Sequence, residues 1–437
     1  MALCCFTASF VSPETFDFHT VYLSACPLED GSSATEVQET WKGPITEILP
    51  KTCLVATMTV DPGRNMVAAG ERFTVENTWQ CLCHRLHTIS CKVVTECDEQ
   101  RLTEHIFNFI SWSTASPYCK KFWKMFQCNC GEIECGFKQV GETRFLTFLD
   151  AIDSYLQNWD TIKAFIAADK CNLSKVPEDY VFTPDDKACV EMIAKLFNPV
   201  CTIVCLAEGD HEPTLCHVPA WINELLQGTK PDIGDSAFIT PWKKALHSKL
   251  QAEFEEMYKT PSLPLCAAVF HPKYGHLPWV TPEVREQVWK RLVEEAEILN
   301  DDGKPEGLFS REKVKAKVEF EALRSVWMDH NKRESVAGLS VQQFWKDNKK
   351  DLSSIIDTAC MFLAIPASSA ASERLWKGAS FTLKHKKGMK ALSLESSTII
   401  RGWTKQPSFD FDTFIGGLQT LIEQQASSPS NSTIKDN

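Results

Sequence analysis

Three stretches of this 437-residue chain hold side chains that could ligate a metal ion or act on a phosphate ester. The first contains Asp61, which ends an apolar, β-branched run and is followed at once by Pro62-Gly63. A strand would fix this carboxylate while the loop leaves it open to solvent, which suits a ligand of a hard cation. The structural alternative is an aspartate that only starts the turn or caps the next helix.

The second stretch, residues 81–87, has the sequence C-L-C-H-R-L-H. Two cysteines and two histidines this close suggest zinc, but the stretch lacks a C-x₂-C pair and a second pair at finger spacing. His84 could equally be a hydrogen-bonded histidine of the core.

The third stretch, residues 365–374, has the sequence I-P-A-S-S-A-A-S-E-R. Its Ala and Ser residues permit close helix packing, and Pro366 fixes the angle at which a new helix begins. Glu373 would then lie on that helix. The structural alternative is a capped helix with its glutamate near the positive end of the helix dipole.

The third stretch resembles the C-terminal dimerisation region of hAT transposases, in which P-A-S-S-A-A-S-E-R is the hallmark string. Residues 344–346 (F-W-K) and 359–364 (A-C-M-F-L-A) fit the same pattern. The resemblance implies that Glu373 corresponds to the third acid of a DDE active site. It also implies a dimerisation role for Pro366, Ser372, Arg374 and Leu392.

The first two stretches are similar to motifs of the same family. Residues 59–66 resemble T-D-x-x-x-N-M, which implies that Asp61 is the second catalytic acid, although Pro62-Gly63 depart from the usual residues. Residues 81–87 resemble C-x-x-H-x-L-N, with His87 in place of Asn. In the family, the histidine that corresponds to His84 helps to position the scissile phosphate.

Weaker matches follow in the family's order. Residues 142–145 resemble x-T-R-W, residues 198–214 resemble P…T…P-T, and residues 270–274 resemble L-D-P-R-Y with His271 in place of Asp. The shared order, over about residues 3 to 403, identifies the chain as similar to hAT transposases.

The first acid of the triad is the main departure from the family. It should lie in a T-x-D-x-W-T-S strand, but residues 3–9 are L-C-C-F-T-A-S, which places Cys5 where the acid belongs. Strand transfer uses two Mg²⁺ ions held by carboxylates, and a thiol is a poor ligand for Mg²⁺. We therefore expect no cofactor and an inactive remnant in which Asp61 and Glu373 mark a vestigial Mg²⁺ site. An active Mg²⁺-dependent transposase is the alternative.

Composition limits the partners. The net charge is -11 and the pI about 5.6, whereas DNA binders usually present a basic surface, so DNA contact should be weak or indirect. The 19 dispersed cysteines and the apparent lack of a signal peptide or membrane span indicate reduced thiols inside the cell. We expect a nuclear location, with the cytoplasm as the alternative.

Family members usually have a BED-type zinc finger ahead of this domain, and this chain begins inside the first core strand. We therefore expect a host-captured (domesticated) protein that lacks the finger. We expect it to dimerise or oligomerise with itself, or with related transposase-derived proteins, and to act in transcription or chromatin. A decoy for an active transposase is a further hypothesis.

Hydrophobic periodicity predicts the elements that must position these residues. Strands are expected near residues 2–10, 19–25 and 52–60, and a helix at 35–49. Long helices then follow, including 144–168, 185–196, 219–226, 245–258 and 282–299. This order predicts an α/β RNase H-like core interrupted by a large all-α insertion domain. The expected parts are 1–95 and 351–403 for the core, 96–350 for the insertion, and 404–437 for a C-terminal helix and disordered tail.

Overall fold

A computed structural model describes residues 2–376, except 29–32, 49–54, 56, 73, 75–77, 100, 116, 130–136, 138–144, 169–182, 210 and 300–305. Within it the chain divides into two compact units. The smaller comprises residues 1–8, 20–53 and 370–437, and the larger comprises residues 9–19 and 54–369.

The larger unit is built almost entirely from helices. In chain order these are α2 (Arg64–Gly70), α3 (Leu82–Cys97), α4 (Leu102–Thr114), α5 (Pro117–Asn129), α6 (Phe145–Gln157), α7 (Trp159–Ala168), α8 (Pro184–Ala207), η3 (Leu215–His217), α9 (Val218–Gly228), α10 (Ile239–Phe254), η4 (Glu255–Tyr258), α11 (Leu263–Val269), α12 (Pro282–Leu299), α13 (Glu306–Met328), α14 (His330–Val336), α15 (Val341–Asn348) and α16 (Ile356–Leu363).

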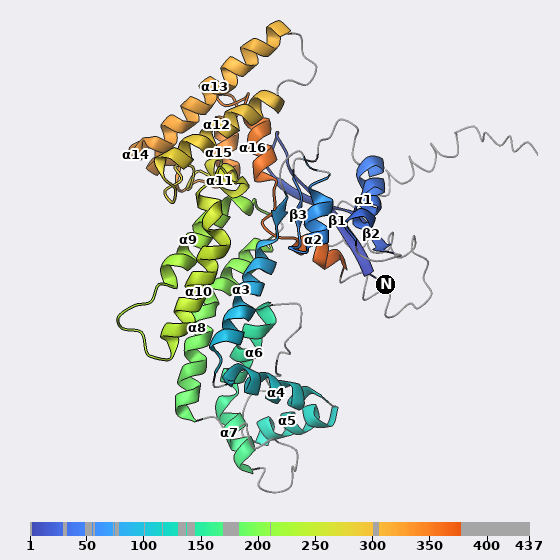
Figure 1. The fold of residues 1–437 in the computed structure, drawn as a ribbon, viewed down its shortest axis with the longest axis vertical. Coiled ribbons are helices and arrows are strands. Elements are labelled where there is room, and N and C mark those ends of the chain that lie inside the picture. The colour runs from blue at the N-terminus through green and yellow to red at the C-terminus, as the bar shows by residue number, and fades with distance from the viewer. Residues whose placement is uncertain are drawn as a thin grey trace, which may run out of the picture. The chain divides into compact units, whose positions relative to one another are not determined.

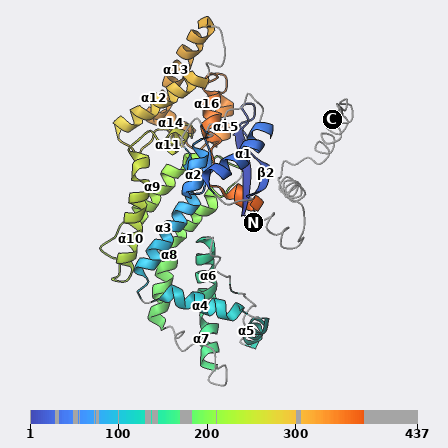
Figure 2. The same ribbon diagram turned by 45° about the vertical axis from the view of Figure 1, so that its right-hand side comes forward.

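These helices form three groups within the larger unit (Figures 1 and 2). Helices α3, α8, α9 and α10 run side by side in the middle, with α4 to α7 at one end and α11 to α16 at the other. Long-range packing joins α3 to α10 and to α8, and α12 to α13 and to α16. One continuous apolar core runs through the unit and includes Leu86, Phe197, Trp242 and Trp345, all buried.

Helix α8 shows how the sequence fixes a helix start. Thr183 accepts a hydrogen bond from the backbone N–H of Asp186, and the Asp186 carboxylate accepts one from the Thr183 backbone N–H. Pro184 occupies the first helical turn, where its missing N–H removes no helical bond. Of the described helices, α8 alone is long and apolar enough to cross a membrane, by length and composition only. Several of its apolar residues, among them Val190 and Ile193, are buried against other helices, although Leu206 is exposed.

The predicted helices at 185–196, 219–226 and 245–258 are confirmed with shifted ends, and the helix predicted at 282–299 is confirmed with the same ends. The single helix predicted at 144–168 is wrong, because α6 and α7 are separate helices that break at Asn158. The buried Asn158 side chain donates to the Ser154 carbonyl at 2.7 Å and accepts from the Gln127 amide at 2.7 Å. Such local side-chain bonds compete with continued helix.

Two short strands of the larger unit form a parallel pair, and residues of the candidate site directly follow each strand in sequence. Strand β3 (Thr59–Val60) pairs with β4 (Trp79–Gln80), with Thr59 opposite Trp79. Helix α2 lies between them in sequence, which gives a short strand–helix–strand crossover. Both strands end at the same edge, so the residues that follow them meet there.

The smaller unit contains strands, one helix and the helical residues 370–376. Strand β1 (Ala2–Val11) pairs with β2 (Phe18–Leu28) as a hairpin, and α1 (Ala34–Ile48) buries Val37 and Trp41. The tip of this hairpin belongs to the larger unit, where Phe16 stacks on Trp345. The predicted strands at 2–10 and 19–25 and the helix at 35–49 are confirmed.

The described residues are mostly helical, which is compatible with the predicted large all-α domain. Their four strands form two separate pairs, β1–β2 and β3–β4. Of the strand predicted at 52–60, the described residues are strand at Thr59–Val60 only. The RNase H-like core and the boundaries at 95/96, 350/351 and 403/404 therefore stay predictions.

Candidate metal-binding site in the larger unit

Asp61 follows β3, and Cys81 follows β4 and caps α3. The Cys81 backbone N–H donates to the Val60 carbonyl at 2.7 Å, which joins the two strand ends. His84 lies one turn into α3, so its imidazole returns toward the same edge. The parallel pairing of two short strands thus brings together side chains that are twenty or more residues apart in sequence.

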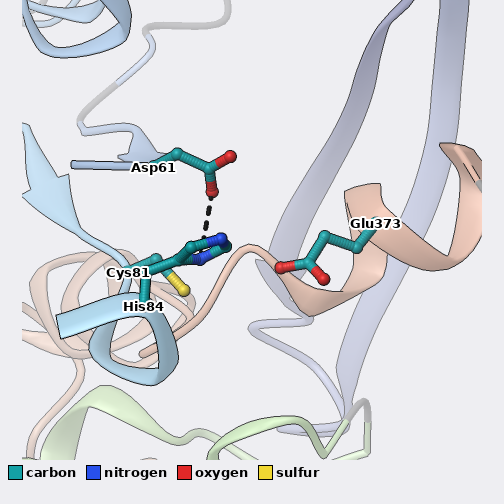
Figure 3. Close-up of side chains that lie close together, drawn as sticks. All are labelled: Asp61, Cys81, His84 and Glu373. Carbon is teal, nitrogen blue, oxygen red and sulfur yellow. Dashed lines mark ion pairs between the residues drawn. The ribbon is translucent and has the colours of Figure 1, made fainter. Parts of the chain in front are cut away.

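The three side chains form a compact donor set (Figure 3). Asp61 Oδ1 and His84 Nδ1 are 3.4 Å apart. One donor atom each from Asp61, Cys81 and His84 lies within 4.8 Å of the other two. Cys81 is fully buried, whereas the Asp61 and His84 side chains are 45% and 32% exposed. The set therefore has a buried thiol and a buried imidazole Nδ1 atom, and the Asp61 carboxylate is its exposed member.

Ser369 contacts two members of this set. Its hydroxyl donates to Asp61 Oδ1 at 2.8 Å, and its backbone N–H donates to Cys81 Sγ at 3.3 Å. Ser369 thereby limits where the carboxylate and the thiol can point.

The segment before Ser369 is held by several bonds. The Pro366 carbonyl accepts from the Thr59 hydroxyl at 2.7 Å, and the Ala367 carbonyl accepts from the Trp79 indole at 3.1 Å. The Ala367 N–H donates to the Thr214 hydroxyl at 2.8 Å, and the Ser368 hydroxyl donates to the carbonyl of Ala207 at 2.8 Å. Residues 365–369 therefore form one wall of the site.

The electrostatics of the set favour a thiolate at Cys81. A hydrogen bond from Cys83 lowers the pKa of the Cys81 thiol well below its ordinary value, and His84 and the Ser369 N–H add to this against the opposing effect of burial. The pKa of Cys83 is raised, because it bonds to Cys81 and is itself buried. Cys83 Sγ also points to the Val204 carbonyl at 3.8 Å.

Arg85 anchors the first turn of α3. Its Nε donates to Glu253 Oε1 at 2.7 Å, and its terminal NH2 donates to the Glu253 carbonyl at 2.7 Å. The guanidinium also lies over two aromatic rings: its central carbon is 4.2 Å from the centroid of the Phe254 ring and 5.2 Å from that of the Trp79 ring. Burial lowers the pKa of Arg85. This anchor fixes the rotation of the helix that presents His84.

The donor set of the larger unit does not fit Mg²⁺. This cation requires near-octahedral oxygen coordination, and a thiol is a soft ligand that it binds poorly. Asp61 supplies a carboxylate, but Cys81 supplies sulfur and His84 supplies nitrogen. This combination is typical of zinc.

Glu373 belongs to the smaller unit, on helical residues 370–376 (Figure 3). Strand β1 of the same unit contacts this helix at two points. Cys5 packs with Tyr22 and Leu375, and the hydroxyls of Thr7 and Ser372 are 3.2 Å apart. Side chains two residues apart on a strand lie on the same face, so residues 5 and 7 share a face and Cys5 faces the helix to which Glu373 belongs.

The residues predicted for dimerisation are found in both units. Pro366 lies in the wall of the larger unit's site, whereas Ser372 and Arg374 lie on the helix of the smaller unit. Leu392 lies outside the described residues, as do residues 142–144 of the weak motif.

The weak motif at 270–274 forms part of an aromatic cluster. The centroid of the His271 ring is 4.6 Å from that of His217 and 4.4 Å from that of Tyr274. The His217 ring stacks on Trp221, with a centroid distance of 5.2 Å. Burial and the charge of Lys273 together lower the pKa of His217 to about 4. Burial, the neighbouring His217 and the charge of Lys273 together lower the pKa of His271 to about 3. Both histidines are therefore neutral in the folded protein at neutral pH.

Comparison with known families gives a match that includes the stretch at residues 365–374. Residues 324–404 match the family model of the hAT family C-terminal dimerisation region. This match supports membership of the hAT family. It spans α14, α15 and α16, the wall at 365–369 and the helix with Glu373. No curated protein matches the chain.

Proposed function

We propose that this hAT-related chain is a host-captured transposase derivative that self-associates in the nucleus and acts in transcription or chromatin without cutting DNA. The observation that matters most is the dimerisation-region match at residues 324–404, which supports self-association. The acidic balance of the chain, with a net charge of -11, favours weak or indirect DNA contact.

The loss of cleavage is proposed from the acids. Asp61 and Glu373 are interpreted as remnants of the second and third catalytic acids, and Cys5 as the replacement of the first. The packing of Cys5 against Tyr22 and Leu375 supports this, because residue 5 of strand β1 then faces the helix that contains Glu373.

Self-association is tested by sedimentation of the full chain over a wide concentration range. We expect a dimer or larger species that dissociates on dilution. Leu392→Glu should weaken it, since Leu392 belongs to the matched region, whereas the same change at the exposed Ile233 serves as control. A chain that stays monomeric at every concentration contradicts the proposal.

A deletion that begins at residue 351 would also remove the wall of the site at 365–369. Deleting residues 377–437 instead leaves every described residue in place. We expect this shortened chain to stay folded and to lose self-association.

Cleavage is tested by incubating the chain with a terminal-inverted-repeat duplex and Mg²⁺. We expect no nicking by the natural chain. Mg²⁺-dependent nicking that Asp61→Asn or Glu373→Gln abolishes would instead identify an active transposase. Location is tested by imaging the tagged chain in cells, where exclusion from the nucleus would refute a chromatin role.

A further inference from the structure

We propose that Asp61, Cys81 and His84 of the larger unit are ligands of a zinc ion. All three residue types are common zinc ligands, and a site with three protein ligands and one open position is an established zinc arrangement. The inference is independent of the proposed function, because it concerns metal binding and not self-association.

The distances between donor atoms fit a zinc ion. Bond lengths of about 2.0–2.3 Å in a tetrahedron place neighbouring donor atoms roughly 3.5 Å apart. Asp61 Oδ1 and His84 Nδ1 are already 3.4 Å apart. With all three donors within 4.8 Å of one another, side-chain movements of about an ångström suffice to close the set.

The surroundings supply the further hydrogen bonds that metal ligands need. Ser369 donates its hydroxyl to Asp61 and its N–H to Cys81, so it orients an oxygen and a sulfur ligand together. The Ser369 N–H also stabilises the thiolate form of Cys81, which is the form that binds zinc. The thiol proton is released to solvent when the metal binds.

Access and rigidity are both present. Cys81 and the Nδ1 atom of His84 are buried, while the Asp61 side chain is 45% exposed, so solvent reaches the site at Asp61. The backbone around the ligands is held by the bond from Cys81 to Val60 and by the Arg85 anchor. A site whose ligand positions are fixed before binding loses less conformational entropy when the ion arrives.

The test titrates the metal-free, reduced full chain with Co²⁺, which reports both sulfur ligation and tetrahedral geometry by its absorption. We expect one equivalent to give a thiolate-to-cobalt charge-transfer band and tetrahedral d–d bands. Zn²⁺ should abolish these bands by displacement, whereas a large excess of Mg²⁺ should leave them unchanged. Absence of the bands, or their loss to Mg²⁺, overturns the proposal.

Variants assign the ligands. Asp61→Asn, Cys81→Ser and His84→Ala should each weaken binding at least about tenfold. Ser369→Ala should weaken it about tenfold, because it removes the hydroxyl bond to Asp61 while the backbone N–H that donates to Cys81 remains. Because Cys81 is buried and its variant could unfold, the partly exposed Asp61 and His84 give the decisive result, with circular dichroism as the check on folding.

The matched control is the double variant His87→Ala/Cys91→Ser. These residues form a neighbouring pair on the same helix, with Cys91 Sγ 3.6 Å from His87 Nε2, and they could bind metal by themselves. The control should keep the bands. Loss of the bands in the control, or their retention in Asp61→Asn and His84→Ala, would refute the assignment.

Discussion

The Ser369 hydroxyl donates a 2.8 Å hydrogen bond to the Asp61 carboxylate across 308 positions of sequence. Ser369 lies inside the segment that matches the hAT dimerisation region, and Asp61 lies at the end of β3. Part of a region described by its role between chains therefore also supports a site within one chain. Changes in this segment should affect the fold of the larger unit as well as assembly.

Ala367→Leu should destabilise the larger unit. Ala367 is fully buried, and its backbone bonds to Thr214, Trp79 and Leu82 leave it little freedom to move. Three additional carbons there overpack the core, at a cost of about 1–3 kcal/mol. Thermal unfolding measures the loss. The same substitution at the exposed Ala252 of α10 should change the melting temperature little; equal effects at both positions would contradict the assigned burial.

Arg85→Lys should also destabilise, although it keeps the charge. A lysine ammonium cannot bond to Glu253 Oε1 and to the Glu253 carbonyl with the fork geometry of the guanidinium. It also cannot stack as a plane over the Phe254 ring. We expect a loss of about 1–3 kcal/mol in the free energy of unfolding by urea. Arg64→Lys, at an exposed position of α2, is the control and should be neutral.

Sequence periodicity predicted helices α1, α8, α9, α10 and α12, because each buries an apolar stripe that repeats every three to four residues. The family resemblance implied that Asp61, His84 and Glu373 belong to one active site. The sequence did not indicate Cys81 as a ligand beside Asp61 and His84, because their meeting depends on the pairing of two strands of two residues each. The Ser369 contact was missed for a similar reason: nothing local in a small-residue stretch indicates a partner 308 positions away.

Gly275→Ala should be costly because of one aromatic ring. A Cβ at Gly275 would lie 2.4 Å from atoms of the Trp327 indole, which is fully buried and cannot move aside. We expect a loss of about 1–3 kcal/mol in unfolding free energy. Gly338→Ala is the matched control, because its Cβ would meet no atom within 4 Å. A neutral result for Gly275→Ala would show that the indole does not pack there.

Stability should fall in mild acid because of His217 and His271. Their pKa values in the folded protein, about 4 and about 3, lie below the ordinary value near 6.5, so the unfolded chain binds more protons between these limits. Stability is therefore fully present above about pH 6.5 and decreases as the pH falls toward 4, by up to about 1.4 kcal/mol per pH unit for each histidine.

Replacing one histidine separates this effect from general acid unfolding. In His271→Asn the slope of unfolding free energy against pH should decrease between about pH 6.5 and pH 4, because one proton uptake is removed and His217 loses a neighbouring ring. His330→Asn, at an exposed position of α14, should keep the natural slope. Denaturant unfolding at a series of pH values measures both. An unchanged slope in His271→Asn would mean that His271 is not held neutral by burial in the aromatic cluster.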